Sequence, residues 1–234
     1  MKSQLQLKQK VREDLGHNAE PFGLSTVELL NEIADLASPQ TYPAEIELFQ
    51  QGAPAREIYF IEEGVIKLVY LNPNGKEAIV GLRSSGWPLG ASALILQEPH
   101  PVTAVTVTRC RLYHVSAETF HHLLNRNPQL SNYLLRTYSR EVYDQMSRIA
   151  ELECFSARQR LERLLWQMLP QTEQGGPQKE KRLRMPLKHS EIAQLIAITP
   201  EHLSRLFKQL EREGVISRKG GGLVISSSQS LSRS

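Results

Sequence analysis

The sequence has few cysteines and no long apolar run, and both absences limit what the chain can be. Only Cys110 and Cys154 occur in 234 residues, which is too few for a disulfide framework or a cysteine-rich metal site. The N-terminal MKSQLQLKQKVRED lacks the apolar core of a signal peptide, and no run of roughly 18 apolar residues follows it. We therefore expect a cytoplasmic, reducing compartment, no membrane partner and no metal site.

What the sequence does have is an uneven distribution of charge. From residue 156 to the end, 14 Lys and Arg stand against 7 Asp and Glu, whereas the first 155 residues carry 14 against 18. A basic C-terminal third beside an acidic remainder predicts a polyanion that binds one domain only. Chance clustering of solvated charges is the alternative. Apolar residues make up 40% of the chain, enough for the cores of two ordinary domains.

Residues 41–115 are rich in short runs with strand propensity. EIELF, EIYFIE, GVIKLVYL, EAIVGL, VTAVTVT and CRLYHV follow one another at about 8 to 12 residues, with glycine or proline turns between them. That spacing predicts an antiparallel barrel or sandwich. Three short helices are expected with these strands. The helix at residues 25–37 precedes them, the helix at 89–97 interrupts them, and the helix at 117–125 follows Ser116, its N-cap.

A long helix is expected next, because residues 129–152 contain neither glycine nor proline. One row of this helix has the alternating spacing of three and four residues that is typical of a heptad. It consists of Leu135, Tyr138, Val142, Gln145, Ile149 and Leu152. We expect this row to pack against the same helix of a second copy, in a parallel homodimer. Burial in the core of the same chain is the alternative.

The most informative stretch is residues 192–214, IAQLIAITPEHLSRLFKQLEREG. Its second half places Leu203, Leu206, Phe207 and Leu210 on one face of a helix that begins at Pro200, with Thr199 as its N-cap. A first apolar segment precedes it by about three residues, which indicates a helix-turn-helix. A strand is expected at 181–187, and residues 215–225 predict a hairpin around Gly220-Gly221-Gly222, the wing of a winged helix.

The order of these elements resembles the family of the cyclic-AMP receptor protein and the fumarate and nitrate reduction regulator. The resemblance covers about residues 20–225, and the glycines that fall where that family turns its β-roll are Gly52, Gly64, Gly75, Gly86 and Gly90. It implies an α+β fold with an N-terminal antiparallel β-roll (a cyclic-nucleotide-binding-like jelly roll), a long dimerisation helix and a C-terminal winged helix-turn-helix. The corresponding domains are 1–127, 128–155 and 156–234. The implied function is that of a dimeric transcription regulator and not an enzyme, with double-stranded DNA and RNA polymerase as partners.

The second helix of the helix-turn-helix carries the most specific match. Its sequence EHLSR is similar to the E-x-x-S-R pattern of the fumarate and nitrate branch, whose half-site resembles TTGAT. Arg205 can pair with guanine O6 and N7, Glu201 can accept a hydrogen bond from cytosine N4, and Ser204 can reach a neighbouring base edge. The alternative for Glu201 and Arg205 is a plain salt bridge along the helix. The candidate phosphate contacts are Lys188, His189, Thr199, His202, Lys208, Arg218 and Lys219.

The sensing site departs from the pattern of the cyclic-AMP branch. That branch holds the ribose and the cyclic phosphate with a Glu and an Arg-Ser pair, whereas the matching positions here are Ala91, Pro101 and Val102. A buried cyclic phosphate without its Arg would be poorly compensated, so cyclic AMP is not expected. We expect an unidentified small-molecule effector, in a pocket formed by Gly90, Ala91, Ser92, His100, Pro101, Val102, Thr103, Tyr138 and Gln145.

No cofactor is predicted for this domain. An iron–sulfur cluster is rejected because it needs four thiolates or close substitutes, and the first 30 residues contain no cysteine. His100 could ligate a haem, as in the haem-sensing branch, although a lone loop histidine is more often an exposed polar residue.

Two other functions stay open at this point. A cupin-like metalloenzyme would need convergent ligands on the barrel, and the seven histidines supply no H-x-H with a following Glu; His114 stands alone. A DNA-binding protein that needs no effector is the second alternative.

Overall fold

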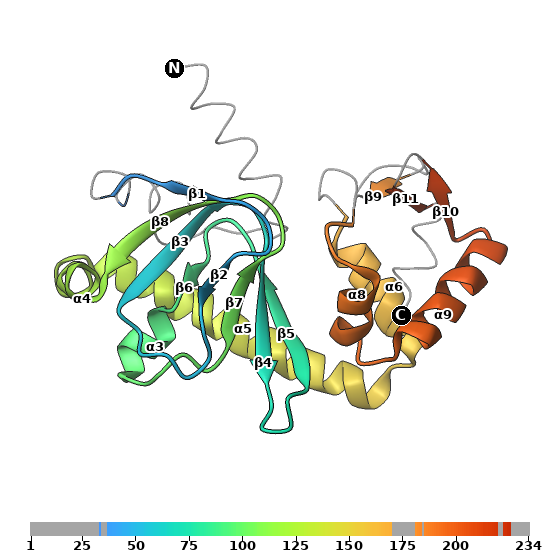
Figure 1. Cartoon of the computed structure of the whole chain (residues 1–234), viewed down its shortest axis with the longest axis horizontal. Helices are drawn as coiled ribbons and strands as arrows, with labels where there is room; N and C mark the ends of the chain where they lie inside the picture. Colours follow the sequence, from blue (N-terminus) through green and yellow to red (C-terminus); the bar gives the residue numbers. More distant parts are fainter. Residues whose placement is uncertain (1–32, 34–36, 170–180, 184, 220–221, 226–234) are drawn as a thin grey trace, which may run out of the picture. The chain divides into compact units, whose positions relative to one another are not determined.

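The computed structural model describes residues 33, 37–169, 181–183, 185–219 and 222–225. The chain forms two compact units (Figure 1), and among the described residues one runs to Tyr143 and the other begins at Asp144. The helix expected at 25–37 lies outside the described residues except for Ile33, which is helical and buried, and Ala37. The glycine turn at 220–221 also lies outside them.

The first unit contains two four-stranded antiparallel sheets, which confirms the predicted fold class. One sheet has the order β1-β8-β3-β6 and the other β2-β7-β4-β5. The strands are β1 (Gln40–Tyr42), β2 (Glu47–Phe49), β3 (Glu57–Glu63), β4 (Ile66–Leu71), β5 (Glu77–Arg83), β6 (Pro88–Leu89), β7 (Thr103–Thr106) and β8 (Cys110–Ser116).

Apolar residues from both sheets form the core of this unit. Ile58, Phe60 and Val115 pack in one buried cluster, and Ile61 and Leu112 in another. Neighbours along β3 enter different clusters because successive side chains of a strand point to opposite faces. The six predicted strands are all present, whereas β1 and β6 were missed because they are three and two residues long and carry no alternating pattern.

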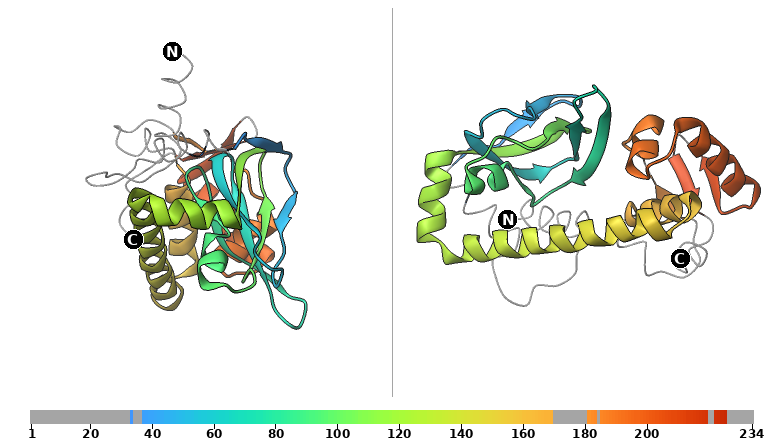
Figure 2. Two further views of the ribbon diagram at one scale, coloured as in Figure 1. Left: turned by 90° about the vertical axis from the view of Figure 1, so that its left-hand side faces the viewer. Right: turned by 90° about the horizontal axis from the view of Figure 1, so that it is seen from below.

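From Gln40 onward, the described part of the first unit contains two short helices and the first part of a long helix beside the sheets. α3 (Ala91–Leu96) interrupts the strands as predicted, and α4 (Ala117–Arg126) begins after Ser116, whose side chain accepts a hydrogen bond from the amide of Thr119. The long helix α5 (Pro128–Cys154) follows at a corner that Figure 2 shows. Asn127 forms this corner because its side-chain oxygen accepts from the amides of Gln129 and Leu130.

The second unit is a winged helix. It contains α6 (Ala157–Gln167), β9 (Lys181–Leu183), α8 (His189–Leu195), α9 (Pro200–Arg212), β10 (Ile216–Lys219) and β11 (Gly222–Ile225). The three strands form an antiparallel sheet of order β10-β11-β9, so the two strands of the predicted wing are present. The edge strand predicted at 181–187 is shorter, since β9 ends at Leu183 and residues 185–187 are not in a strand. Leu161 and Leu165 of α6 and Leu203 and Leu210 of α9 are fully buried.

Candidate nucleic-acid interface

The start of α9 is fixed by its first residues. Thr199 caps the helix by accepting a hydrogen bond from the amide of His202 at 3.2 Å, and Pro200 occupies the first turn. The apolar stripe predicted from the sequence is buried in the domain. Glu201, Ser204, Arg205 and Lys208 are therefore left on the exposed face.

Glu201 and Arg205 lie on this exposed face without being tied to each other. The described part of the chain contains no hydrogen bond or ion pair between them. Hydrogen bonds from the backbone N–H of Glu201 and from Thr199 lower the pKa of the Glu201 carboxyl, and the charge of Arg205 adds a smaller effect. A charged, acceptor-only carboxylate and an unengaged guanidinium are thus available to base edges.

Ser204 is partly engaged by its own helix. Its hydroxyl donates to the carbonyl of Pro200 at 3.0 Å, the backbonding that serine often forms inside helices. The oxygen keeps its acceptor lone pairs. In this conformer Ser204 presents an acceptor, and not a donor, to a base edge.

The turn between α8 and α9 is a Schellman motif. The amide of Ile198 donates to the carbonyl of Ala193, and the amide of Ala197 donates to that of Gln194. Ala197 occupies the left-handed position at φ 54°, where glycine is usual because it has no Cβ. The turn thus holds a strained alanine three residues before α9 begins.

The predicted phosphate contacts differ in how available their side chains are. Lys188, His189, Thr199 and Lys208 are exposed, and His202 is half-buried. Arg218 is exposed but pairs with Glu211 at 2.7 Å, so a phosphate would have to compete with that carboxylate. Lys219 lies in β10, and only its backbone is described.

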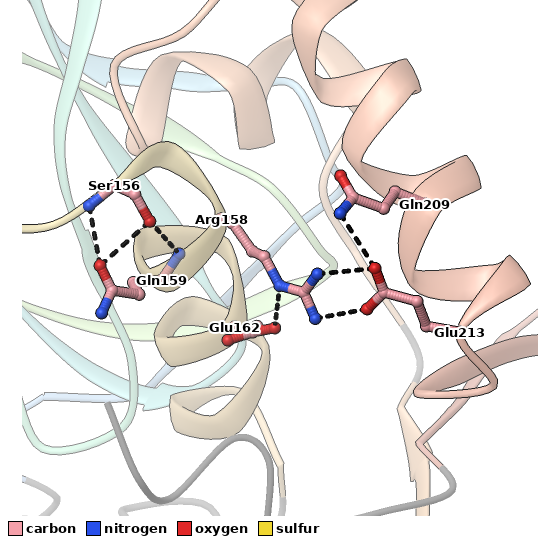
Figure 3. Close-up of polar contacts among 6 residues, drawn as sticks. All are labelled: Ser156, Arg158, Gln159, Glu162, Gln209 and Glu213. Atoms are coloured by element: carbon pink, nitrogen blue, oxygen red, sulfur yellow. Dashed lines mark hydrogen bonds and ion pairs between the residues drawn. The ribbon is translucent and has the colours of Figure 1, made fainter.

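Arg158 of α6 binds the C-terminal end of α9, a contact that the sequence did not predict. Figure 3 shows Arg158 between two carboxylates. Its Nε is 2.8 Å from Glu162, its Nη1 and Nη2 are 2.9 and 2.5 Å from the two oxygens of Glu213, and Gln209 donates to Glu213 as well. Arg158 and then Gln209 lower the pKa of Glu213. No sequence signal marks this contact, because Arg158 and Glu213 are 55 residues apart.

His100 lies in the interior of the first unit. It is 5% exposed, its ring stacks on Phe49 at 3.9 Å between centroids, and burial lowers its pKa. The expectation that it is an exposed polar residue was wrong, because its loop packs inward beside Gly90. A Cβ at Gly90 would come within 3.2 Å of the His100 ring.

The other predicted pocket residues are spread over three segments. Gly90 caps α3 at φ 85°, Ala91 is fully buried, and Ser92 follows in the same helix. Pro101 is exposed, Val102 is half-buried, and the Thr103 hydroxyl accepts from the amide of Gln51 at 3.0 Å. Gln145 belongs to the second compact unit and is half-buried.

Tyr138 faces the sheets of its own unit. Its hydroxyl donates to the carbonyl of Pro88 at 3.3 Å, its ring meets Trp87 edge to face, and burial raises its pKa to about 12. Next to it, Arg83 pairs with Glu141 of α5 at 2.5 Å and stacks over Trp87 at 4.4 Å. The sequence reading missed Arg83 and Glu141 because each looks like an isolated surface charge.

The exposed apolar row of α5 differs in part from the predicted heptad row. Leu135, Val142 and Ile149 are 66%, 60% and 63% exposed, and Leu152 is 41% exposed. Met146, at 65%, stands beside this row, whereas Tyr138 and Gln145 are half-buried. The apolar seam therefore follows Leu135, Val142, Met146 and Ile149.

Comparison with known proteins places both units in established domain families. Residues 39–127 match the cyclic nucleotide-binding domain, and residues 159–234 match the Crp-like helix-turn-helix domain. No described helix is long and apolar enough to cross a membrane.

Individual relatives match over most of their length. The chain is 24% identical to the CRP-like cAMP-activated global transcriptional regulator of Mycobacterium tuberculosis, over 83% of this chain and 87% of the relative. It is 26% identical to the fumarate and nitrate reduction regulatory protein of Vibrio cholerae, over 88% and 81%. The fold is similar to that of the c-di-GMP responsive global regulator CLP of Xanthomonas campestris, with a TM-score of 0.72 and 21% identity over 86% and 98% of the two chains. Because it carries a cyclic-nucleotide-binding domain followed by a Crp-like helix-turn-helix domain, the chain belongs to the Crp/Fnr family of DNA-binding transcription regulators.

Proposed function

We propose that this regulator binds as a homodimer to a palindromic DNA site whose half-sites resemble TTGAT, and that α9 reads each half-site. The observation that carries the proposal is the exposed face of α9, where Glu201, Ser204 and Arg205 stand together without a salt bridge between the two charged residues. In this assignment Arg205 reads guanine, Glu201 reads cytosine, and Ser204 accepts from a base amino group. The phosphate contacts come from the exposed polar residues around α8, α9 and the wing.

The dimer in this proposal forms along α5. Leu135, Val142, Met146 and Ile149 give an apolar row whose members are each at least 60% exposed, and such a row is typical of a helix that pairs with a second copy. A twofold dimer presents two recognition helices to successive major-groove faces, about 34 Å apart.

The effector proposal concerns the first unit. We propose that a small molecule other than cyclic AMP binds near Gly90, Ser92 and Tyr138, and that it shifts the balance between two arrangements of the DNA-binding units. Ala91, Pro101 and Val102 support the exclusion of cyclic AMP, because none of them offers a charge to a cyclic phosphate. Regulation further implies contact with RNA polymerase.

A titration of labelled duplexes tests the DNA assignment. We expect a duplex with two inverted TTGAT half-sites to bind much more tightly than one with a single half-site, and the affinity to fall steeply with salt. Repeating the titration with pools of cell metabolites tests the effector. Equal affinity with and without every pool would support the alternative of a DNA-binding protein that needs no effector.

A further inference from the structure

The C-terminal end of α8 is held by two arginines that come from outside the helix-turn-helix. Three of its last carbonyls are satisfied locally: those of Ile192, Ala193 and Gln194 accept the amides of residues 196, 198 and 197. The next two carbonyls, of Leu195 and Ile196, have no backbone donor among the described hydrogen bonds. Arg148 of α5 donates to Leu195 at 3.2 Å, and Arg160 of α6 donates to Ile196 at 3.0 Å.

These two contacts are electrostatically favourable for the same reason. The last carbonyls of a helix carry the negative end of its dipole, so a cation that also donates hydrogen bonds is stabilised there. Helix α8 has no basic residue in its own last turn. The two guanidinium groups therefore supply from α5 and α6 the positive charge that α8 lacks.

The same arginines connect the helix-turn-helix to the end of the long helix. Besides reaching Ile196, Arg160 donates from Nη1 to the carbonyl of Phe155 at 2.7 Å, immediately after α5 ends. Arg163 of α6 adds a 2.8 Å ion pair to Glu151 of α5. Residues 144–154 of α5 accordingly belong to the same compact unit as α9.

That part of α5 also carries half of the exposed apolar row. Met146 and Ile149 flank Arg148 in the sequence, and both are more than 60% exposed, whereas Arg148 is half-buried on another side of the helix. One short segment thus presents apolar side chains to solvent and a guanidinium to α8. If the apolar row is the dimer seam, Arg148 fixes the distance and angle from that seam to the recognition helix.

We propose that Arg148, supported by Arg160, is a positioning residue that sets the half-site spacing which the dimer accepts. The inference rests on the proposed palindromic dimer. Arg148 touches no base in this account, so it does not change which half-site sequence is read. It determines how far apart, and at what rotation, two half-sites have to lie.

The experiment compares wild type with Arg148→Met, which keeps the aliphatic stem and removes the N–H donors. Each protein is titrated with three duplexes whose inverted half-sites are separated by the best spacer, by one base pair less and by one more. One base pair changes the rotation by roughly 35°. Arg140→Met, an exposed arginine earlier in α5, is the control, and Arg148→Lys tests rescue by a cation that can still donate.

We expect wild type and Arg140→Met to share one spacing preference. In Arg148→Met the preference should be about three- to tenfold weaker, as the net loss of one typical hydrogen bond implies. Arg148→Lys should regain part of it. An equal loss of affinity at all three spacers, or an unchanged preference, would overturn the inference. A wild type without any spacing preference would instead refute the palindromic dimer itself. If Arg148→Met unfolds, Arg148→Leu, which also lacks N–H donors, carries the same comparison.

Discussion

Arg205 and Lys208 lie on the same exposed face of α9, and we expect them to contact DNA in different ways. Replacing Arg205 by Ala should cost about 1–3 kcal/mol at one base pair and relax the preference there, because a bidentate pair with guanine is lost. Replacing Lys208 by Ala should weaken binding to all sequences alike and reduce the salt slope by about one. Titrations with single-base variants of the half-site measure both. An unchanged preference in Arg205→Ala would show that Arg205 does not read the guanine.

Glu213 gives a prediction about acid stability. Arg158 and Gln209 lower its pKa from the ordinary 4.5, so the folded state holds the charged form more strongly than the unfolded state does. This stabilisation is fully present above the ordinary pKa and is lost as the pH falls through the lowered value. The deficit in unfolding free energy of Glu213→Gln should therefore be present at pH 7 and shrink below about pH 4.5.

Urea unfolding at several pH values measures this deficit. Glu153→Gln serves as the control, since Glu153 is an exposed carboxylate of α5. A deficit for Glu213→Gln that stays constant across this pH range would show that the contact between Arg158 and Glu213 stabilises the fold equally with a neutral side chain.

At the scale of elements, the two helix ends of the helix-turn-helix form a natural comparison. Ala197 after α8 and Gly214 after α9 occupy the same left-handed position, at φ 54° and 71°. The left-handed conformation costs alanine about 1–2 kcal/mol relative to glycine. Against this, glycine lowers the stability of the fold by about 0.4–1 kcal/mol, because it gives the unfolded chain more conformational freedom. Ala197→Gly should then stabilise the domain by up to about 1 kcal/mol, and Gly214→Ala should destabilise it by a similar amount.

Urea midpoints of the two variants measure these opposite effects. At Gly214 an added Cβ would meet nothing within 4 Å, so the loss would come from the backbone alone. A loss of stability in Ala197→Gly would contradict the strained turn.

The seam of α5 gives the second prediction at this scale. Val142→Glu and Ile149→Glu place charges at positions that are 60% and 63% exposed in the single chain, so each variant should keep its fold. Each should dissociate the dimer, because a carboxylate would be buried in an apolar interface. Light scattering measures the mass, and Asn132→Glu on an exposed part of the same helix is the control. Variants that stay dimeric would place the interface elsewhere.

The elements also show how much the sequence alone can predict. The six strands, α5 and α9 follow from patterns of neighbouring residues, since alternation, heptad spacing and an N-cap such as Thr199 act locally. The two-residue strand β6 carries too little pattern to be recognised. Arg148 and Arg160 could not be recognised either, because their partners at the end of α8 are 47 and 36 residues away and come into reach only once the domain has packed.

His100 and Tyr138 illustrate the same limit in the first unit. A lone histidine between two prolines gives no local sign that it will be buried. Tyr138 fits the heptad spacing of α5, but its hydroxyl finds the carbonyl of Pro88, 50 residues earlier. Leu135, Val142 and Ile149 of the predicted row are exposed, whereas Tyr138 packs on the neighbouring sheet. That this row pairs with a second copy stays a prediction.

The whole molecule is a transcription regulator in which a cyclic-nucleotide-binding type of domain precedes a helix-turn-helix domain. Membership in a family of transcription regulators removes the cupin-like metalloenzyme from consideration. The three-part division into residues 1–127, 128–155 and 156–234 stays a prediction. The basic C-terminal unit fits DNA binding, since long-range attraction to phosphates supplies most non-specific affinity.

The central claim is that α9 reads a palindromic site through Glu201, Ser204 and Arg205. Selection of bound duplexes from a random pool, with wild type and with Arg205→Ala in parallel, tests this reading. We expect an inverted repeat of TTGAT-like half-sites for wild type, and the same repeat with relaxed preference at one base pair in each half for Arg205→Ala. Recovery of a motif without twofold symmetry, or of identical motifs for both proteins, would contradict it.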